Sequence, residues 1–424
     1  MTTTFKSQIT PGIGGAPDVG YDFRFTSLNL WNTARKGDLT VSDTIEIAEV
    51  FGPGNALTGQ LDITNSAGVG WITDATRYIE IRAAAGQQHP GYWSTSKARG
   101  SITTNDARAI FINSGTTGKR IDLRITGMQF EVSTNTNNTV DGLQVIYNDN
   151  GNGSVYCTID KCLIRYKTTA ADAGLNIPLE NTCVWIVGNS GPTIDYTIKN
   201  SVLLFTLASQ ITIGGDPWPN PVVVRGIHNT NGTVTSYNND VVIRTNGGDG
   251  QGTMYIVAVE TAAVFISQNC YYAYAGAAVD GTFIYQGVTP GSNDATVNDE
   301  APTYQDVLFT TTNFTNIGAD TEDLHIKTGS VLKNNGVTLG SVTYDFVGIS
   351  RPQGPAFDIG ANEYEYPPIC WNYTARYHNS NKLFKASGCG SFPKSLRVPG
   401  NIDPSTGRMI DDGILINPDE YRVC

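Results

Sequence analysis

One short unit recurs five times in the middle of this 424-residue chain, and this recurrence limits the folds it can adopt. Each copy has a short strand, a polar or Gly-containing break, and a second short strand. A unit repeated at intervals of this size is typical of a solenoid, in which successive copies stack on one another. The second strands begin at Met128, Cys162, Ser201, Asp240 and Cys270, at intervals of 34, 39, 39 and 30 residues.

Apolar side chains alternate within these second strands, as Met128, Phe130 and Val132 illustrate. Such alternation indicates strands with one buried face. A third strand lies between copies, for example GLQVIY from Gly142 and CVWIVG from Cys183. The sequence therefore predicts an all-β parallel β-helix with three strands per coil. A β-sandwich is the alternative, but sandwiches do not repeat a strand–tight break–strand unit at a nearly constant interval.

The breaks inside the copies are short and rich in residues that tolerate left-handed backbone angles, which suits the corner of a solenoid. They are Thr126-Gly127, Asp160-Lys161, Lys199-Asn200 and Asn238-Asn239.

Composition changes along the chain divide it into three predicted parts. Residues 1–70 mix Pro, Gly and scattered apolar positions, and we expect them to cap the first coil. Residues 71–366 form the predicted β-helix. Residues 367–424 contain much of the late basic charge, and we expect an extended C-terminal arm that docks on a neighbouring protein.

The composition excludes several classes of protein. Lys and Arg number 28 against 39 Asp and Glu, which gives a formal net charge of −11. An acidic chain is a poor sequence-independent nucleic-acid binder, because phosphate binding needs clustered basic side chains. No apolar run approaches the roughly 18–20 residues of a membrane-spanning helix. The first residues also lack the basic start and apolar stretch of a secretory signal, so we expect synthesis in the cytoplasm.

Seven cysteines are too few and too scattered to indicate a disulfide framework, and no CxxC pair offers a zinc site. We expect mostly buried free thiols, while the disulfide state of Cys370, Cys389 and Cys424 stays open.

Two stretches resemble known proteins. The segments TGSVLKNNGV from Thr328 and YDFVGISRPQGPAFDIGANEYE from Tyr344 resemble the closing coil of many right-handed parallel β-helix (pectin-lyase-like) proteins. The resemblance implies that this segment ends the solenoid, and it carries no specificity for activity. The matching residues include a set that we name the closing motif: Asp345, Arg351, Asp358 and Glu363.

The second stretch, GWITDATRYIEIRAAAGQQHPGYW from Gly70, resembles the first-coil segment of β-helix structural proteins of tailed bacteriophages. This resemblance implies a virion protein whose partners are other virion proteins and host surface glycans. Trimerisation is the usual habit of viral β-helices and is expected on that ground alone.

Catalytic signatures are sparse. A glycosidase needs two carboxylates that flank the scissile bond, and Asp240 and Asp216 are the weak candidates for such a role. Asp240 is more simply explained as a polar corner or ladder residue. Neither the Asn/Gly-rich loops nor the four histidines have the spacing of metal ligands, so we expect no metal and no cofactor.

Aromatic side chains are the remaining candidates for contact with a glycan or a partner. Tyr271, Trp185 and Trp218 fall on or near the coils. Aromatic residues of this kind that face outward suit sugar stacking or protein contact, because they supply a large surface at a low cost in entropy.

The leading hypothesis is a non-enzymatic phage virion protein exposed on the particle, either a capsid decoration or a tail-associated adhesin. A polysaccharide depolymerase of a phage tailspike is the alternative from another class. A secreted bacterial adhesin is a third option, against which the missing signal counts.

Overall fold

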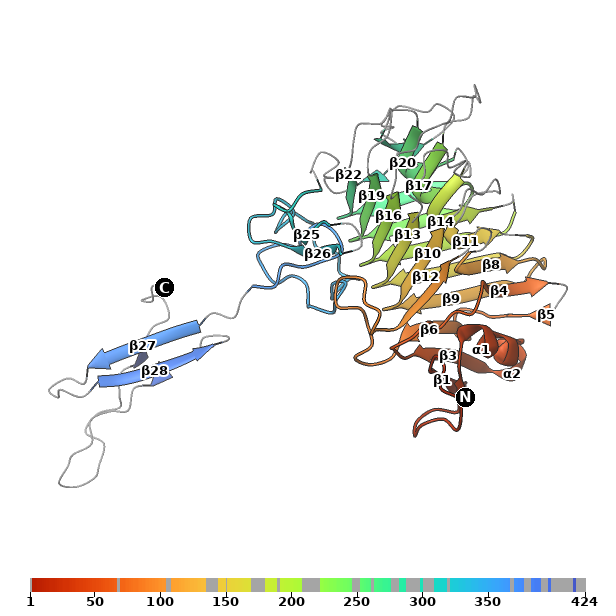
Figure 1. The fold of residues 1–424 in the computed structure, drawn as a ribbon, viewed down its shortest axis with the longest axis horizontal. Coiled ribbons are helices and arrows are strands. Elements are labelled where there is room, and N and C mark those ends of the chain that lie inside the picture. The colour runs from red at the N-terminus through yellow and green to blue at the C-terminus, as the bar shows by residue number, and fades with distance from the viewer. Residues whose placement is uncertain are drawn as a thin grey trace. The chain divides into compact units, whose positions relative to one another are not determined.

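Parallel strands form three long sheets in this computed structural model (Figure 1). Between Ile79 and Gln286 each coil contributes one strand to each sheet. The structure describes residues 2–66, 69–103, 108–134, 144–149, 151–168, 180–188, 191–207, 222–245, 252–260, 263–275, 282–286, 298–299, 309–318, 321–366, 370–376, 383–389, 396–397 and 415–416.

Sheet A is the longest, and all its pairings are parallel. It contains, in spatial order, β2 (Phe23–Phe25), β1 (Thr3–Ile9), β3 (Thr44–Val50), β6 (Ile79–Ala83), β9 (Arg120–Thr126), β12 (Ser154–Asp160), β15 (Ile194–Lys199), β18 (Thr233–Tyr237), β21 (Val264–Gln268) and β24 (Asn298–Asp299).

Sheets B and C complete each coil, and only the short β4–β5 pair is antiparallel among the described pairings of these two sheets. Sheet B contains β22 (Tyr271–Ala275), β19 (Asp240–Thr245), β16 (Val202–Leu207), β13 (Leu163–Thr168), β10 (Gln129–Thr134) and β7 (Arg99–Thr103). Sheet C contains β23 (Thr282–Gln286), β20 (Gly252–Val259), β17 (Val222–Asn229), β14 (Glu180–Val187), β11 (Gln144–Asp149), β8 (Ile110–Ser114), β4 (Leu61–Ser66) and β5 (Val69–Gly70).

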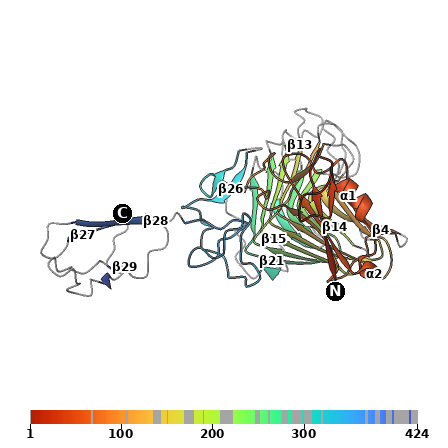
Figure 2. The ribbon, with the colours of Figure 1, turned by 90° about the horizontal axis from the view of Figure 1, so that it is seen from below.

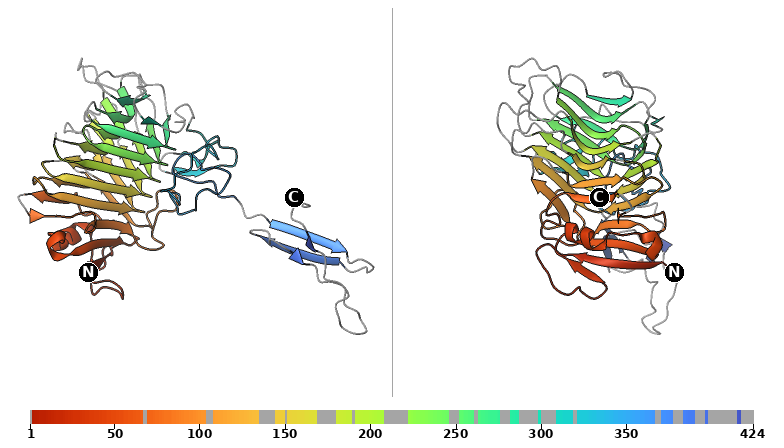
Figure 3. Two further views of the ribbon diagram at one scale, coloured as in Figure 1. Left: turned by 180° about the vertical axis from the view of Figure 1, so that it is seen from behind. Right: turned by 90° about the vertical axis from the view of Figure 1, so that its right-hand side faces the viewer.

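The chain therefore passes from sheet A to B to C and back to A, as the stacked strands of Figure 3 show. This arrangement is the predicted parallel β-helix with three strands per coil. The inward side chains of the three sheets form one continuous apolar core. Tyr166 and Phe205 stack within it at 4.4 Å between ring centroids, and Cys162 and Cys270 are buried there.

The corner between sheets A and B repeats with the coil. Its residue has a positive φ in each copy: Gly127, Lys161, Asn200, Asn238 and Asn269. Asn suits this position because its short amide tolerates the left-handed region and bonds locally. The Asn238 amide donates to Oδ1 of Asn200 at 3.4 Å, and the Asn200 amide donates to Oδ1 of Asp160 at 3.2 Å.

This corner corrects the alignment of the fourth repeat. In the structure Asn239 precedes β19, and Asp240 pairs with Val202 and with Tyr271. Asp240 therefore lies one residue beyond the position of Ser201, to which the sequence analysis matched it. A one-residue shift moves a side chain to the other face of the sheet, so Asp240 points out of the solenoid core.

Two short helices lie at the N-terminal end, which faces the viewer in Figure 2. They are α1 (Leu28–Arg35) and α2 (Leu39–Ser42). Leu28 and Trp31 of α1 are buried in the solenoid core. The helix begins at Ser27, whose hydroxyl accepts from the Leu30 amide as an N-cap. The first 70 residues thus contribute both these helices and strands of sheets A and C.

Residues 309–318 and 321–364, which we call the side module, pack against the outer face of sheet B (Figure 1). The module contains the antiparallel pair β25 (Phe314–Asn316) and β26 (Asp323–Ile326). Phe314, Leu332 and Ile359 belong to one buried cluster with outward residues of sheet B. The sequence analysis expected the segment from Thr328 to end the solenoid; instead it covers the side. The physical reason is that sheet B carries apolar residues on its outer face, which burial stabilises.

Residues 365–424 form a separate compact unit. Its described strands pair antiparallel, β27 (Cys370–Arg376) with β28 (Leu383–Cys389) and β29 (Leu396–Arg397) with β30 (Leu415–Ile416). The predicted arm therefore contains a β-hairpin.

Candidate binding face on sheet C

An aromatic row crosses the outer face of sheet C. Inward and outward residues alternate along each strand, so Val184 and Ile186 are buried in the core and Trp185 between them faces outward. The parallel register places equivalent outward residues side by side on successive coils. We call this row the aromatic ladder, and its members are Phe111, Tyr147, Trp185 and His228.

The rings of the ladder contact one another in sequence. Phe111 and Tyr147 are stacked with centroids 5.8 Å apart, and Tyr147 meets Trp185 edge-on at 5.3 Å. Trp185 stacks on His228 at 5.2 Å. Phe111, Tyr147 and Trp185 are each half-buried, whereas His228 is 3% exposed. The ladder is thus a continuous ring surface that remains partly open to solvent.

A guanidinium covers one end of the ladder. The Cζ atom of Arg108 lies 4.0 Å from the ring centroid of Tyr147 and 5.6 Å from that of Phe111. Nε of Arg108 donates to Oε1 of Gln144 at 2.6 Å, which fixes the plane of the group. Among the described residues no carboxylate forms an ion pair with Arg108. A guanidinium is a group that can bind an anion through parallel hydrogen bonds.

A carboxylate and an imidazole lie at the other end. Nε2 of His228 is 3.1 Å from Oε1 of Glu260, whose side chain is 52% exposed. The hydrogen bond from His228 lowers the pKa of Glu260. This end of the ladder therefore presents an ionised acceptor beside the stacked rings.

The structure places the three predicted aromatic contacts differently. Trp185 lies in the ladder, on the outside of the solenoid. Tyr271 is fully buried beneath the side module, with its ring 5.2 Å from that of Phe314, so the prediction of an exposed contact is wrong for this residue. Tyr271 pairs beside Asp240 on the covered face of sheet B. Trp218 lies outside the described residues.

The two predicted acids do not form a catalytic pair in the described residues. Asp240 is 1% exposed, and its Oδ1 accepts from the Ala361 amide of the side module at 3.2 Å. Burial raises the pKa of Asp240 to about 7, against the opposing effects of the Ala361 hydrogen bond and of Arg351. Gly360 sits directly over this carboxylate, where a Cβ atom would collide with it. Asp240 therefore cannot reach a polymer, and Asp216 lies outside the described residues.

The structure brings the closing motif together in the side module. Arg351 donates to the carbonyl oxygens of Asp358, Gly360 and Ala361 at 2.7–3.1 Å, and Nη1 lies 3.4 Å from Oε2 of Glu363. The carboxylate of Asp345 accepts from three backbone amides, those of Val347, Ile349 and Glu363. Asp358 accepts from the Asn334 amide at 2.6 Å. Burial raises the pKa of all three acids of the motif.

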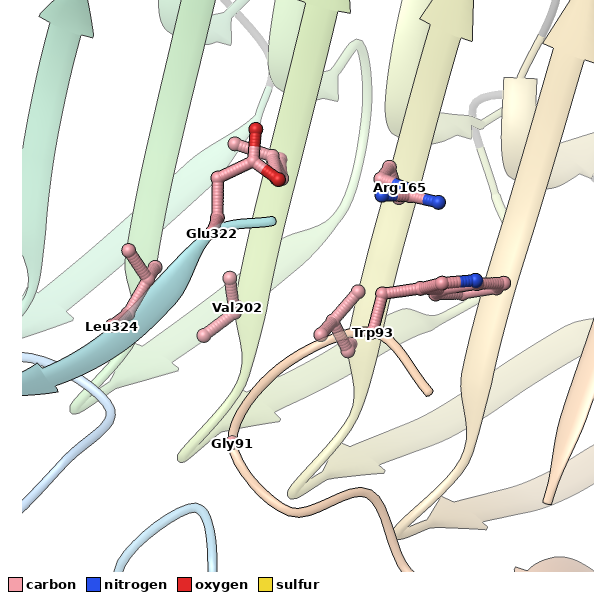
Figure 4. Close-up of a pocket in the computed structure, with 8 residues that line it drawn as sticks. Gly91, Trp93, Arg165, Val202, Glu322 and Leu324 are labelled. Atoms are coloured by element: carbon pink, nitrogen blue, oxygen red, sulfur yellow. The ribbon is translucent and has the colours of Figure 1, made fainter. Parts of the chain in front are cut away.

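A small pocket lies where the module meets sheet B (Figure 4). Arg165 is 3% exposed and lies 4.5 Å from the Trp93 ring centroid, while its Nε donates to Glu131 at 2.5 Å. Glu322 approaches from the module, and Arg244 is 3.7 Å from it. Because Arg165 is neutralised by Glu131 and shielded by Trp93, this cluster holds the surrounding segments together and offers little to a ligand.

Sequence reasoning missed Arg108, Phe111, Tyr147 and His228. The signal that could have found the rings is the third strand of each coil: in AIFIN, VIYND, VWIV and GIHN an aromatic residue lies next to an inward Ile. Aligning only the strand–break–strand units left these strands unmatched. No signal in the sequence marks Arg108, whose contact depends on the register.

In the part of the chain that the structure describes, no helix has the length and apolar character required to span a membrane. In the same residues, no group of three or more His, Cys, Asp or Glu side chains is arranged to hold a metal ion.

Comparison with known proteins gives a fold neighbour only. No family model matches the chain, and no curated protein matches it. Among solved structures, the crystal structure of pectate lyase Pel9A is similar at a TM-score of 0.29 and 13% sequence identity, over 86% of this chain and 98% of that chain. The chain is an all-β protein with the architecture of a parallel β-helix.

Proposed function

We propose that this chain is a non-enzymatic glycan-binding protein of a tailed phage virion, and that the aromatic ladder of sheet C is its binding face. The observation that carries the proposal is the continuous, half-buried row of Phe111, Tyr147 and Trp185. The guanidinium of Arg108 lies over this row and forms no ion pair among the described residues. Sugar rings have apolar faces that stack on aromatic rings, and their hydroxyl and acidic groups bond to charged side chains. Both kinds of partner lie side by side here.

The charges at the two ends give the proposed ligand its chemistry. Arg108 suits a carboxylate, phosphate or sulfate substituent, because a guanidinium binds such planar or multidentate anions through two parallel hydrogen bonds. Glu260 suits sugar hydroxyls as an acceptor. The proposed ligand is therefore an acidic polysaccharide that lies along the ladder.

The virion assignment rests on the resemblance of the segment from Gly70 to phage structural proteins, and partners among other virion proteins follow from it. Mass spectrometry of purified particles from a lysate that encodes the chain tests this part. Peptides from the chain in intact particles are expected, and their confinement to the soluble fraction would contradict it. Light scattering of the purified protein tests the proposed trimer.

The binding face is tested with purified bacterial capsular polysaccharides, acidic and neutral, by isothermal titration calorimetry. We expect binding of an acidic member to weaken at least tenfold in Trp185→Ala and in Arg108→Gln. The matched control is Trp93→Ala, which removes a tryptophan from the sheet B side and should leave the affinity unchanged. Equal losses in Trp93→Ala and Trp185→Ala would overturn the proposal.

A polysaccharide depolymerase remains the second candidate, and the pair of His228 and Glu260 beside the ladder is the observation that favours it. A histidine and a carboxylate within hydrogen-bonding distance can transfer protons to or from a bound sugar. Release of reducing ends or unsaturated products from the bound polysaccharide, abolished in Glu260→Gln, would establish this candidate. Binding without product release supports the non-enzymatic role.

A further inference from the structure

The hairpin of the C-terminal unit brings two cysteines directly opposite each other. Strands β27 and β28 pair antiparallel in a register that matches Cys370 with Cys389. Opposite residues in such a pair have Cα atoms about 4.5 or 5.5 Å apart, according to the type of pair. A disulfide requires about 4.4–6.8 Å between Cα atoms. The backbone therefore admits a bond between these two positions in either type of pair.

A crosslink would stabilise this hairpin. A two-stranded hairpin alone is at best marginally stable in water. The C-terminal unit is compact by itself, and beside this hairpin its described strands are the two-residue pair β29 and β30. A bond between the open ends of β27 and β28 restricts the unfolded chain and so stabilises the paired state. We propose that Cys370 and Cys389 form a disulfide that locks this hairpin under oxidising conditions.

The cysteines of the solenoid do not compete for this bond. Cys157, Cys162, Cys183 and Cys270 are all buried. Burial raises the pKa of Cys162 and of Cys183 to about 12. Because the thiolate is the form that attacks a disulfide, these thiols do not exchange in the folded protein. Cys424, outside the described residues, is the remaining competitor.

The oxidant is a small disulfide such as oxidised glutathione. The thiolate of one cysteine attacks a glutathione sulfur, forms a mixed disulfide and releases the first glutathione as a thiolate. The thiolate of the other cysteine then attacks the protein sulfur of this mixed disulfide and releases the second glutathione. The two cysteines lose two electrons, the glutathione disulfide gains them, and the two protons pass to the released thiolates.

Peptide mapping of the folded full-length chain tests the bond. The protein is incubated with oxidised and reduced glutathione, its free thiols are alkylated, and it is digested with trypsin without reduction. Trypsin cleaves after Arg376 and Lys385, so the two cysteines leave in separate peptides that only the disulfide joins. The joined pair is expected as the main product. Alkylation of both cysteines, or bonding of either mainly to Cys424, would overturn the proposal.

Three variants test whether the disulfide depends on the pairing register of the hairpin or only on the closeness of two cysteines. Cys424→Ser should keep the joined peptides, and Cys370→Ser should lose them. The register control combines Cys389→Ser with Gly388→Cys, which moves the thiol opposite Trp371. A step of one residue turns a side chain to the other face of the hairpin, so this variant should form at least tenfold less of the bond. Undiminished bonding would contradict the proposal. All changed residues lie in the C-terminal unit, residues 365–424, so protection of the backbone amides of β27 and β28 from hydrogen exchange reports whether each variant keeps the hairpin.

Discussion

The outer faces of sheets B and C belong to the same coils but serve different ends. Outward residues of sheet B, such as Leu163, Val202 and Val242, are apolar and lie buried under the side module. The equivalent face of sheet C carries the aromatic ladder, in which Phe111, Tyr147 and Trp185 are half-buried and His228 is buried. One face therefore adds to the core of the protein, and the other is the face that we propose binds a glycan. The inward residues of a solenoid specify its stack, while each outer face is free to take its own role.

The largest effect on stability should come from disrupting the closing motif in the side module, which covers sheet B. Arg351→Met removes a guanidinium that is buried among the closing-motif acids and leaves Glu363 without its ion pair. Removing one partner of a buried pair costs about 3–5 kcal/mol. Urea denaturation should show a loss of this size in the free energy of unfolding. The matched control is Lys333→Met, which removes a less buried cation over the Tyr364 ring and should cost at most about 1 kcal/mol. Equal losses would contradict the role of Arg351.

The next effect concerns pH. The folded pKa of Asp240 is about 7 against an ordinary value of 3.8. Between these values the folded carboxyl stays protonated while the unfolded one ionises, so the folded state binds more protons and stability falls as pH rises. Asp240 should therefore lower the free energy of unfolding by a few kcal/mol, about 1.4 kcal/mol for each unit of pKa shift, as the pH rises from 4 to 7. Asp240→Asn should abolish this decrease.

Free energies of unfolding measured across this range for both proteins test the point. The acids of the closing motif, Asp345, Asp358 and Glu363, titrate in both proteins, so their contribution cancels in the comparison. Parallel stability curves for Asp240→Asn and the unchanged protein would show that this carboxylate is not held protonated under the side module.

A smaller effect is expected at the corner between sheets A and B, which leads into the covered sheet. Asn238 has a φ of +50° and is fully buried. Asn238→Ala should cost about 1–2 kcal/mol, because a residue with Cβ pays this amount for left-handed backbone angles when no local bond compensates. Asn238→Gly keeps the backbone freedom and should lose less. A lower melting temperature for Asn238→Gly than for Asn238→Ala would contradict this explanation of the corner.

The smallest effect on stability should follow truncation of the ladder. Trp185→Ala removes a half-buried side chain whose ring contacts Tyr147 and His228, so we expect a loss of about 1 kcal/mol in the free energy of unfolding, the value of such a ring contact. The same variant is expected to lose glycan binding. A loss of several kcal/mol would instead assign Trp185 to the packing of the fold.

The sequence predicts the parts of the molecule that depend on local pattern. The alternation in strands such as β10 and β13 and the corner residues Gly127, Lys161 and Asn200 are sufficient to infer a parallel β-helix. The inward direction of Cys162 follows from the same repeat. These features recur in successive copies of the repeat, so the pattern in one copy strengthens the interpretation of the others.

The parts that depend on register or on distant contacts could not be predicted. Asp240 was assigned to the wrong position because its repeat is one residue out of step, and its burial depends on a module more than 100 residues later in the chain. The sequence alone allows Tyr271 to face solvent, because the contact that buries its ring comes from Phe314, which is distant in the chain. The contact of Arg108 with Tyr147 joins residues on different coils, so no local sequence pattern predicts it.

Hydroxyl-radical footprinting of the full-length chain, with and without a bound acidic capsular polysaccharide, tests the central claim that the open face of sheet C is the binding face. The account predicts that oxidation of Trp185, Tyr147 and Phe111 falls when the polysaccharide binds, while oxidation of Trp93 on the sheet B side does not change. Protection of Trp93 with the ladder left unprotected would contradict it.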